Sequence, residues 1–248
     1  MFTIPPRNAG ENNKDYSYRV IRDAIMFLEL KPGQVISEID LAQKLEISRT
    51  PIREVLGKLR EENLVEVIPQ VGTYVSKIDI QLIEEAAFMR FVMEKEIVKL
   101  ACESFPKESL QELKNNLAIQ KLMVSQDGRE RDFHRLDTQF HRIIFKGVRK
   151  ENIWFSITRL STHYNRIRVL SELENSFAQA VEEHREMVDC LEQGNVEHVD
   201  NIVRRHIIEP MRLWNRLITP DSPFSEYFNN RGELYKTLST IGNFYDLS

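Results

Sequence analysis

The stretch ISRTPIREVLGKLREENLVEVIPQVGTYV, residues 47–75, holds the signals that decide the fold of the N-terminal part. Pro51 is tolerated in the first turn of a helix. Apolar residues then recur at helical spacing, at Ile52, Val55, Leu56 and Leu59. Two short apolar runs follow at residues 64–68 and 73–76, joined by PQVG, which is typical of a hairpin. We therefore expect a helix from Ser48 with a β-hairpin directly after it.

Two more helices are expected before this stretch. Residues 16–30 place apolar side chains on one helical face, and KPG ends that helix. Ser37, with Asp40 three residues on, is a pair typical of a helix N-terminus and predicts a short helix through residue 45. A helix, a helix-turn-helix and a hairpin together predict a winged helix-turn-helix domain over residues 1–76.

Beyond the linker SKID at residues 76–79 the pattern is helical, without proline between Lys107 and Glu209. We expect helices at residues 80–104, 108–125, 129–146, 151–173, 175–193 and 196–218. The predicted fold class is therefore mainly α: a winged domain followed by an all-α bundle over residues 77–218. The polar tail, residues 219–248, carries aromatic side chains that suggest packing, namely Phe224, Tyr227, Phe228, Tyr235 and Phe244.

The composition, 42% hydrophobic and 29% charged residues, is typical of a soluble globular protein. Apolar runs fall far short of the ~20 residues of a membrane span, and the N-terminus shows no secretory signal. Cys102 and Cys190 have no ligand spacing, so we expect two buried thiols in a reducing compartment. A cytoplasmic protein without membrane association is expected.

The net charge of −4 does not favour general nucleic-acid binding, so any such binding must come from a local arrangement. Residues 48–60 hold four basic side chains against the lone acid Glu54. In helix-turn-helix proteins the start of the second helix reads bases, and arginine bound to guanine is the commonest specific contact. The residues in that position are Ser48, Arg49, Thr50 and Arg53. A solvated helix or a protein-binding winged domain are the alternatives.

The helical part contains a possible metal-ligand set. Asp137 and His141 are four residues apart and share a helix face. His184 precedes Gly194 by ten residues and His206 follows it by twelve. In an antiparallel helix pair both lie about 15–18 Å from that turn, at a similar height. Three imidazoles and a carboxylate suit Zn²⁺ best, with Ni²⁺ or Mn²⁺ as alternatives.

Spacing alone does not select these ligands. His134 shares a face with Asp137 and His141, and histidines on amphipathic helices are more often solvent-edge or core residues. The spacing is therefore equally compatible with histidines that bind no metal.

The segment LAQKLEISRTPIREVLGKLREENLVEVIPQVGTYV resembles the DNA-binding domain of the GntR superfamily of bacterial transcription regulators. The resemblance implies double-stranded DNA as a partner, with DNA contacts at Ser48, Arg49, Thr50 and Arg53. It also implies a minor-groove approach of the wing turn, residues 70–72, including Gly72. Many relatives carry a basic residue where this chain has Gln70 and Val71, and some carry one near Ile39, so phosphate binding is expected to be weaker here.

Residues 80–218 resemble the FadR-type C-terminal ligand-binding domain, FCD, of one GntR subfamily, through MRFVMEKEIVKLA, DTQFH, EH at 183–184 and HI at 206–207. The resemblance implies metal ligands at Asp137, His141, His184 and His206, and a pocket arginine at Arg90. Some acyl-CoA-binding members lack this ligand pattern, so a fatty-acyl effector is not expected.

Arg159, His163 and Arg166 form a polar stripe at i, i+4 and i+7 of the predicted helix 151–173. One interpretation is a solvated face. The other is that His163 or Arg166 joins Arg90 in binding an anion, because a carboxylate between a metal and a guanidinium satisfies both oxygens.

Together these observations predict a metabolite-responsive transcription regulator, a homodimer on a palindromic operator, with a small carboxylate effector bound at a divalent metal. One rival is a metal-dependent enzyme with Glu183 as general base. The other is a regulator whose metal is purely structural.

Overall fold

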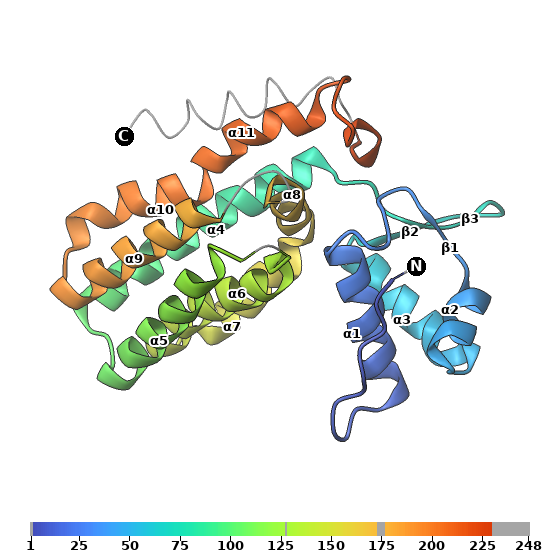
Figure 1. Cartoon of the computed structure of the whole chain (residues 1–248), viewed down its shortest axis with the longest axis horizontal. Helices are drawn as coiled ribbons and strands as arrows, with labels where there is room; N and C mark the ends of the chain where they lie inside the picture. Colours follow the sequence, from blue (N-terminus) through green and yellow to red (C-terminus); the bar gives the residue numbers. More distant parts are fainter. Residues whose placement is uncertain (1, 127, 173–176, 230–248) are drawn as a thin grey trace.

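The computed structural model describes residues 2–126, 128–172 and 177–229 (Figure 1). The N-terminal part combines three helices and three short strands, as the sequence predicts for a winged helix-turn-helix. The helices are α1 (Asn13–Met26), α2 (Glu38–Leu45) and α3 (Arg49–Glu61). The strands are β1 (Val35–Ile36), β2 (Val65–Ile68) and β3 (Gly72–Val75), in antiparallel order β1-β3-β2.

The predicted start of α2 is confirmed in atomic detail. The Ser37 hydroxyl accepts a hydrogen bond from the Asp40 backbone amide at 3.2 Å. Glu46 ends α2 in the left-handed conformation, with φ of 55°, and turns the chain into α3. The sequence does not reveal β1, because a two-residue strand has no periodicity to detect.

The C-terminal part is a helical bundle whose core is separate from that of the winged domain (Figure 1). Cys102 and Cys190 are buried free thiols in this second core, as expected. Its helices are α4 (Ile80–Glu103), α5 (Lys107–Met123), α6 (Glu130–Gly147), α7 (Glu151–Leu160), α8 (Thr162–Glu172), α9 (Ala178–Gln193), α10 (Val199–Ile207) and α11 (Glu209–Ile218). Two single 3₁₀ turns are η1 (Val196–His198) and η2 (Ser225–Tyr227).

The single helix expected at 151–173 is wrong, because the chain breaks at Ser161 into α7 and α8. The Ser161 hydroxyl donates to the Ile157 carbonyl at 2.7 Å, and Ser161 leaves helical geometry with φ of −94° and ψ of 21°. Side chains after the break therefore point in directions that a continuous helix would not give them.

The single helix expected at 196–218 is also wrong. It is divided into η1, α10 and α11, and Pro210 lies in the first turn of α11. Proline lacks the amide hydrogen that would continue α10, so the ladder is interrupted there. Nearby, the Ile207 carbonyl accepts a hydrogen bond from the Tyr164 hydroxyl at 3.1 Å.

The beginning of the tail packs on the bundle, as its aromatic residues suggest. Phe228 is buried and forms an isolated parallel bridge with Ile78 at the end of the linker. Of the aromatic residues named for this tail, Tyr235 and Phe244 lie outside the described residues.

Candidate metal centre and DNA-reading face

The start of α3 presents the predicted DNA contacts to solvent. Ser48 occupies the N-cap position without a capping bond from its own side chain. The Arg49 and Arg53 side chains are 56% and 68% exposed, and Thr50 is exposed beside them. Hydroxyls and guanidinium groups on one solvent-facing helix start are suited to phosphates and base edges.

Glu38 of α2 holds both arginines, which sequence reasoning missed. Its carboxylate lies 3.1 Å from Arg53 Nη2 and 3.4 Å from Arg49 Nη2. Hydrogen bonding and the charge of Arg53, followed by the bonds and charge of Arg49, lower the pKa of Glu38 despite partial burial. An acid in the first turn of α2 was visible in the sequence, but its pairing depends on how α2 crosses α3.

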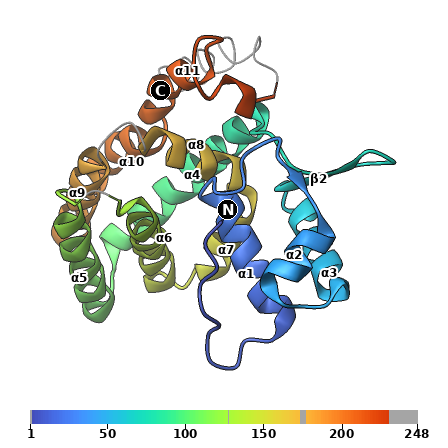
Figure 2. The ribbon, with the colours of Figure 1, turned by 45° about the vertical axis from the view of Figure 1, so that its right-hand side comes forward.

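The wing extends away from the rest of the molecule (Figure 2). Gly72 opens β3 opposite Ile68. In the turn between them, Gln70 adopts a left-handed φ of 62°, and the Val71 side chain is 67% exposed. The wing turn therefore presents backbone and uncharged side chains to solvent.

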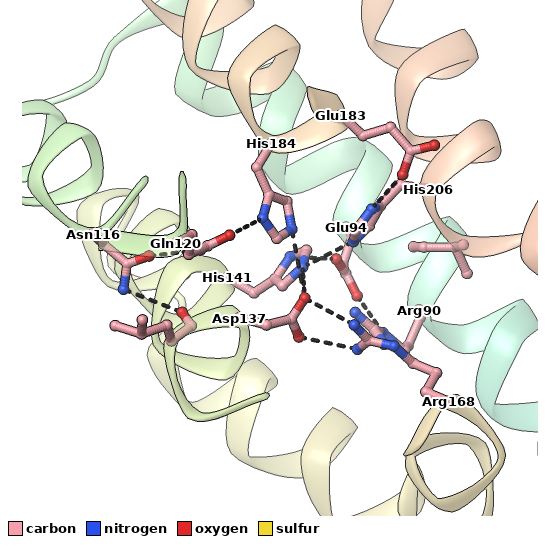
Figure 3. Close-up of polar contacts among 12 residues, drawn as sticks. Arg90, Glu94, Asn116, Gln120, Asp137, His141, Arg168, Glu183, His184 and His206 are labelled. Atoms are coloured by element: carbon pink, nitrogen blue, oxygen red, sulfur yellow. Dashed lines mark hydrogen bonds and ion pairs between the residues drawn. The ribbon is translucent and has the colours of Figure 1, made fainter. Parts of the chain in front are cut away.

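Four side chains from three helices converge inside the bundle (Figure 3). One ligand atom from each lies within 4.8 Å of the others, and all four residues are buried. The residues are Asp137 and His141 of α6, His184 of α9 and His206 of α10. The predicted set is therefore brought together in space. His134 lies elsewhere, with its ring centroid 6.0 Å from that of Phe27, the C-cap residue of α1, in an edge-on arrangement.

Each imidazole is held through its Nδ1 atom by a different polar side chain. The bonds join His141 to Glu94 at 2.8 Å, His184 to Gln120 at 2.8 Å and His206 to Glu183 at 2.9 Å. A ring that donates from Nδ1 carries its lone pair on Nε2, the atom that faces the cluster. Sequence spacing does not predict these partners, because they depend on the rotation of each helix.

The direction of the bond to His184 is fixed by a chain of amides. Asn116 donates from Nδ2 to the Leu136 carbonyl, at 3.1 Å, so its Oδ1 accepts from Gln120 at 2.7 Å. Gln120 therefore presents its oxygen to His184, which must donate from Nδ1. The Leu136 carbonyl therefore fixes the tautomer of His184 through Asn116 and Gln120, and this tautomer carries the lone pair on Nε2.

The charge states also suit a metal centre. Burial lowers the pKa of His141 and holds that of His184 well below its usual range, so both rings are neutral at pH 7. Burial opposes ionisation of Asp137, but the charge and the hydrogen bonds of Arg168 outweigh it and hold the pKa of Asp137 well below the ordinary value. Neutral imidazoles and an ionised carboxylate are the metal-binding forms.

The lone pairs inside the cluster need a positive partner. His141 Nε2 and His206 Nε2 face each other at 3.2 Å, although both rings donate from Nδ1. The buried Nε2 of His184 has no hydrogen-bond partner within the described residues and lies 3.5 Å from Asp137 Oδ1. Facing acceptors are unfavourable unless a cation lies between them, so the donor set fits a divalent ion.

Two buried arginines lie beside the cluster. Arg90, the predicted pocket arginine, donates to Glu94 at 2.6 Å and lies 4.9 Å from the Tyr164 ring centroid. Arg168 of α8, which the sequence reasoning missed, donates to both oxygens of Asp137 at 2.9 and 3.0 Å. No sequence motif points to Arg168. Its position also depends on the break at Ser161, which the continuous helix expected at 151–173 did not include.

His163 and Arg166 are not brought to the cluster. His163 accepts from the Asp79 amide at Nδ1, 2.8 Å away, and therefore donates from Nε2 to the Asn63 carbonyl at 2.8 Å. Arg166 donates to the Ser76 carbonyl at 2.7 Å. The break at Ser161 turns these side chains toward the winged domain, so we do not assign them to the effector site.

Within the described part of the chain, no helix is both long and apolar enough to cross a membrane.

Comparison with known proteins agrees with both halves of the structure. Residues 17–75 match the family described as bacterial regulatory proteins, gntR family, and residues 85–209 match the FCD domain. An uncharacterised HTH-type transcriptional regulator from an unstable DNA locus of Streptomyces ambofaciens is 32% identical over 199 residues, covering 80% of this chain and 83% of that protein. The HTH-type transcriptional repressor RspR of Escherichia coli K12 is 25% identical over 193 residues, covering 77% and 84%.

Solved structures share the fold. Escherichia coli McbR/YncC has a TM-score of 0.72 at 17% identity, covering 84% of this chain and 100% of that one. A GntR regulator from Rhodococcus sp. RHA1 has a TM-score of 0.66 at 20% identity, covering 81% and 96%. With a winged helix-turn-helix domain, a helical second half and these matches, the chain belongs to the GntR family of bacterial transcription regulators and carries an FCD domain.

Proposed function

We propose that this regulator is a homodimer that reads a palindromic operator and responds to a small organic acid bound at a metal centre. The observation that carries this proposal is the buried cluster of three imidazoles and one carboxylate in a chain with an exposed DNA-reading helix. A dimer with two-fold symmetry places two reading helices on half-sites about one DNA turn apart.

The DNA contacts are assigned to the start of α3 and to the wing. Arg49 and Arg53 read base edges or bind phosphates, and the hydroxyls beside them position the helix on the backbone. Gly72 and the wing turn approach the minor groove. The residues of the proposed contact are Ser48, Arg49, Thr50, Arg53 and Gly72.

The metal ligands are assigned to Asp137, His141, His184 and His206, with Zn²⁺ as the best-fitting ion and Ni²⁺ or Mn²⁺ as alternatives. A divalent ion held there would supply a positive anchor for an effector carboxylate. Arg90 and Arg168 add positive charge on the same side of the bundle.

Helix α8 supplies a physical connection between the two halves. Arg168 holds Asp137, while Thr162 and His163 donate to the Glu62 and Asn63 carbonyls at the end of α3. An effector that shifts Arg168 would therefore bias the position of the reading helix.

The contacts of the candidate general base do not favour a metalloenzyme. Glu183, the candidate general base, accepts from His206 Nδ1 at 2.9 Å and from Gln179 at 3.0 Å. Glu183 therefore orients the candidate metal ligand His206, and its carboxylate is not free to activate water.

The test of DNA reading is fluorescence anisotropy on the operator, selected from random-sequence DNA with the purified protein. Arg49→Ala is expected to lower operator affinity about 10- to 100-fold with the fold intact, because a base-reading arginine contributes about 1–3 kcal/mol. Arg159→Ala, exposed on α7, is the matched control. Unchanged affinity in Arg49→Ala would contradict the assignment.

The role of the metal is tested with Asp137→Ala. Because this variant also breaks the buried Arg168 ion pair, both proteins are measured with and without chelator. A sensing site predicts that chelator abolishes the effector response of the wild type with operator binding retained. A purely structural metal predicts that chelator lowers the melting temperature of the wild type strongly and that of Asp137→Ala little.

A further inference from the structure

One open cavity reaches the metal cluster among the described residues, and its volume is about 420 Å³. This volume suits a small-molecule ligand. On the other side of Asp137, the space that Arg90 lines is nearly filled, with about 10 Å³ remaining. The described residues that line the larger space are Tyr164, Arg168, Ser171, Phe177, Ala178, Gln179, Ala180, Glu183, His206, Pro210, Leu213 and Trp214.

The inner end of this cavity is polar. Arg168, Glu183 and His206 are 9%, 3% and 6% exposed, so they form its floor, while Leu213, which is 52% exposed, lies at its rim. His206 belongs to the metal cluster and Arg168 holds Asp137. A ligand in the cavity therefore has its acidic group at this end.

The walls are aromatic and apolar. Tyr164 and Trp214 pack edge to face with ring centroids 5.2 Å apart, and Phe177, the N-cap residue of α9, also lines the cavity. Pro210 and Leu213 of α11 complete the apolar surface. Such walls favour a flat apolar ligand body, because aromatic rings gain from stacked or edge-on contact.

Polar side chains along the walls are already engaged with protein groups. The Tyr164 hydroxyl donates to the Ile207 carbonyl, and Gln179 donates to Glu183. A sugar acid would find few partners for its hydroxyls among these side chains, and each hydroxyl left without a partner weakens binding by roughly tenfold. The lining therefore favours an acid without hydroxyl groups on its body.

The formal charges at the inner end favour a single carboxylate. The Arg90–Glu94 and Arg168–Asp137 pairs are each neutral, and Glu183 adds one negative charge. A divalent ion in the cluster changes this sum to one positive charge, which one carboxylate neutralises. A dicarboxylate or tricarboxylate would bring excess negative charge into a buried site.

We propose that this cavity binds an aryl monocarboxylate as the effector, with its carboxylate at the inner end and its ring between the aromatic walls. The proposal rests on the proposed function, since it names the chemical class of effector for the same metal centre. It narrows that class by excluding sugar acids and polycarboxylates.

The test is isothermal titration of the Zn²⁺-loaded full chain with benzoate and phenylacetate, compared with gluconate and citrate. Aryl acids are expected to bind at least about tenfold more tightly than either competitor. Leu213→Asp places a negative charge at the rim and is expected to weaken aryl-acid binding about tenfold. Leu122→Asp, at an exposed leucine of α5 outside the cavity, is the matched control.

Three outcomes would overturn the proposal, and they separate it from the proposed function. Tight binding of gluconate or citrate with weak aryl binding rejects the ligand class and leaves an acid-responsive regulator. Aryl binding that is equal in Leu213→Asp and Leu122→Asp rejects the cavity. Failure of every acid to bind protein that is Zn²⁺-loaded and operator-competent rejects both this ligand class and the acid effector of the proposed function.

Discussion

Arg168 and Asp137 form an ion pair with two hydrogen bonds inside the bundle, and this pair joins α8 to the four candidate metal ligands. Asp137 is 2% exposed, so its charge is removed from solvent and depends on Arg168 for compensation. A divalent ion at the same carboxylate would provide a second source of positive charge. The need for Arg168 should therefore depend on whether a metal is bound.

Arg168→Met is expected to destabilise the chelator-treated protein by about 3–5 kcal/mol, because it leaves a buried carboxylate unpaired. With Zn²⁺ bound the loss should be clearly smaller. Urea unfolding with and without chelator measures both values. Arg185→Met, which removes a 40% exposed arginine paired on the surface, should change the unfolding free energy little in either state. Equal losses in Arg168→Met with and without Zn²⁺ would contradict a metal at Asp137.

Gln120→Leu is expected to weaken Zn²⁺ binding about 10- to 100-fold, because it removes the acceptor that orients His184. Competition with a chromophoric chelator measures the affinity. The same helix offers a matched control in Gln111→Leu, since Gln111 makes a similar amide contact with Asn115 on the exposed face. Equal affinities in the two variants would show that Gln120 does not support a metal ligand.

Glu38→Gln is expected to raise the affinity for random-sequence DNA about two- to fivefold, because it frees Arg49 and Arg53 for phosphates. The ratio of operator to random-sequence affinity should fall, since the carboxylate no longer orients the two guanidinium groups. Anisotropy titrations at several salt concentrations measure both affinities. Glu54→Gln, which removes the exposed partner of Lys14 on the same domain, should leave the ratio unchanged.

Acid is expected to lower the free energy of unfolding through protonation of His163 in the unfolded chain. Burial, and then the charge of Arg166, lowers its pKa from 6.5 to about 3. Between these two pKa values His163 is protonated in the unfolded chain and neutral in the folded chain. The contribution of neutral His163 to the free energy of unfolding is therefore complete above about pH 6.5 and is lost as the pH falls toward 3. At about pH 5.5 the loss should be on the order of 1 kcal/mol.

His163→Asn keeps an acceptor and a donor but does not titrate. The difference in unfolding free energy between wild type and His163→Asn should therefore change by that amount between about pH 7.5 and 5.5. Because the histidines of the metal cluster are present in both proteins, their titration cancels. A constant difference would show that His163 is accessible to protons in the folded state.

Periodicity was sufficient to predict the winged domain and the convergence of the four candidate metal ligands. Asp137 and His141 share a face of α6 because helical spacing dictates it, and the turn at Gly194 brings His184 and His206 to one height. Arg168, Glu94 and Gln120 could not be predicted in this way, because contacts between helices depend on rotation about each axis. A single break at Ser161 was enough to place His163 and Arg166 against the winged domain.

The contacts from α8 to the reading domain have a consequence for divergence within the family. Thr162, His163 and Arg166 all donate to main-chain carbonyls, those of Glu62, Asn63 and Ser76. Every amino acid presents such a carbonyl, so these three contacts of α8 do not depend on which side chains the winged domain carries at those positions. The main constraint is conformational: Asn63 has a φ of 56°, which favours asparagine or glycine at that turn. The conformation of the turn after α3 therefore constrains this attachment more than the identity of the side chains in that turn.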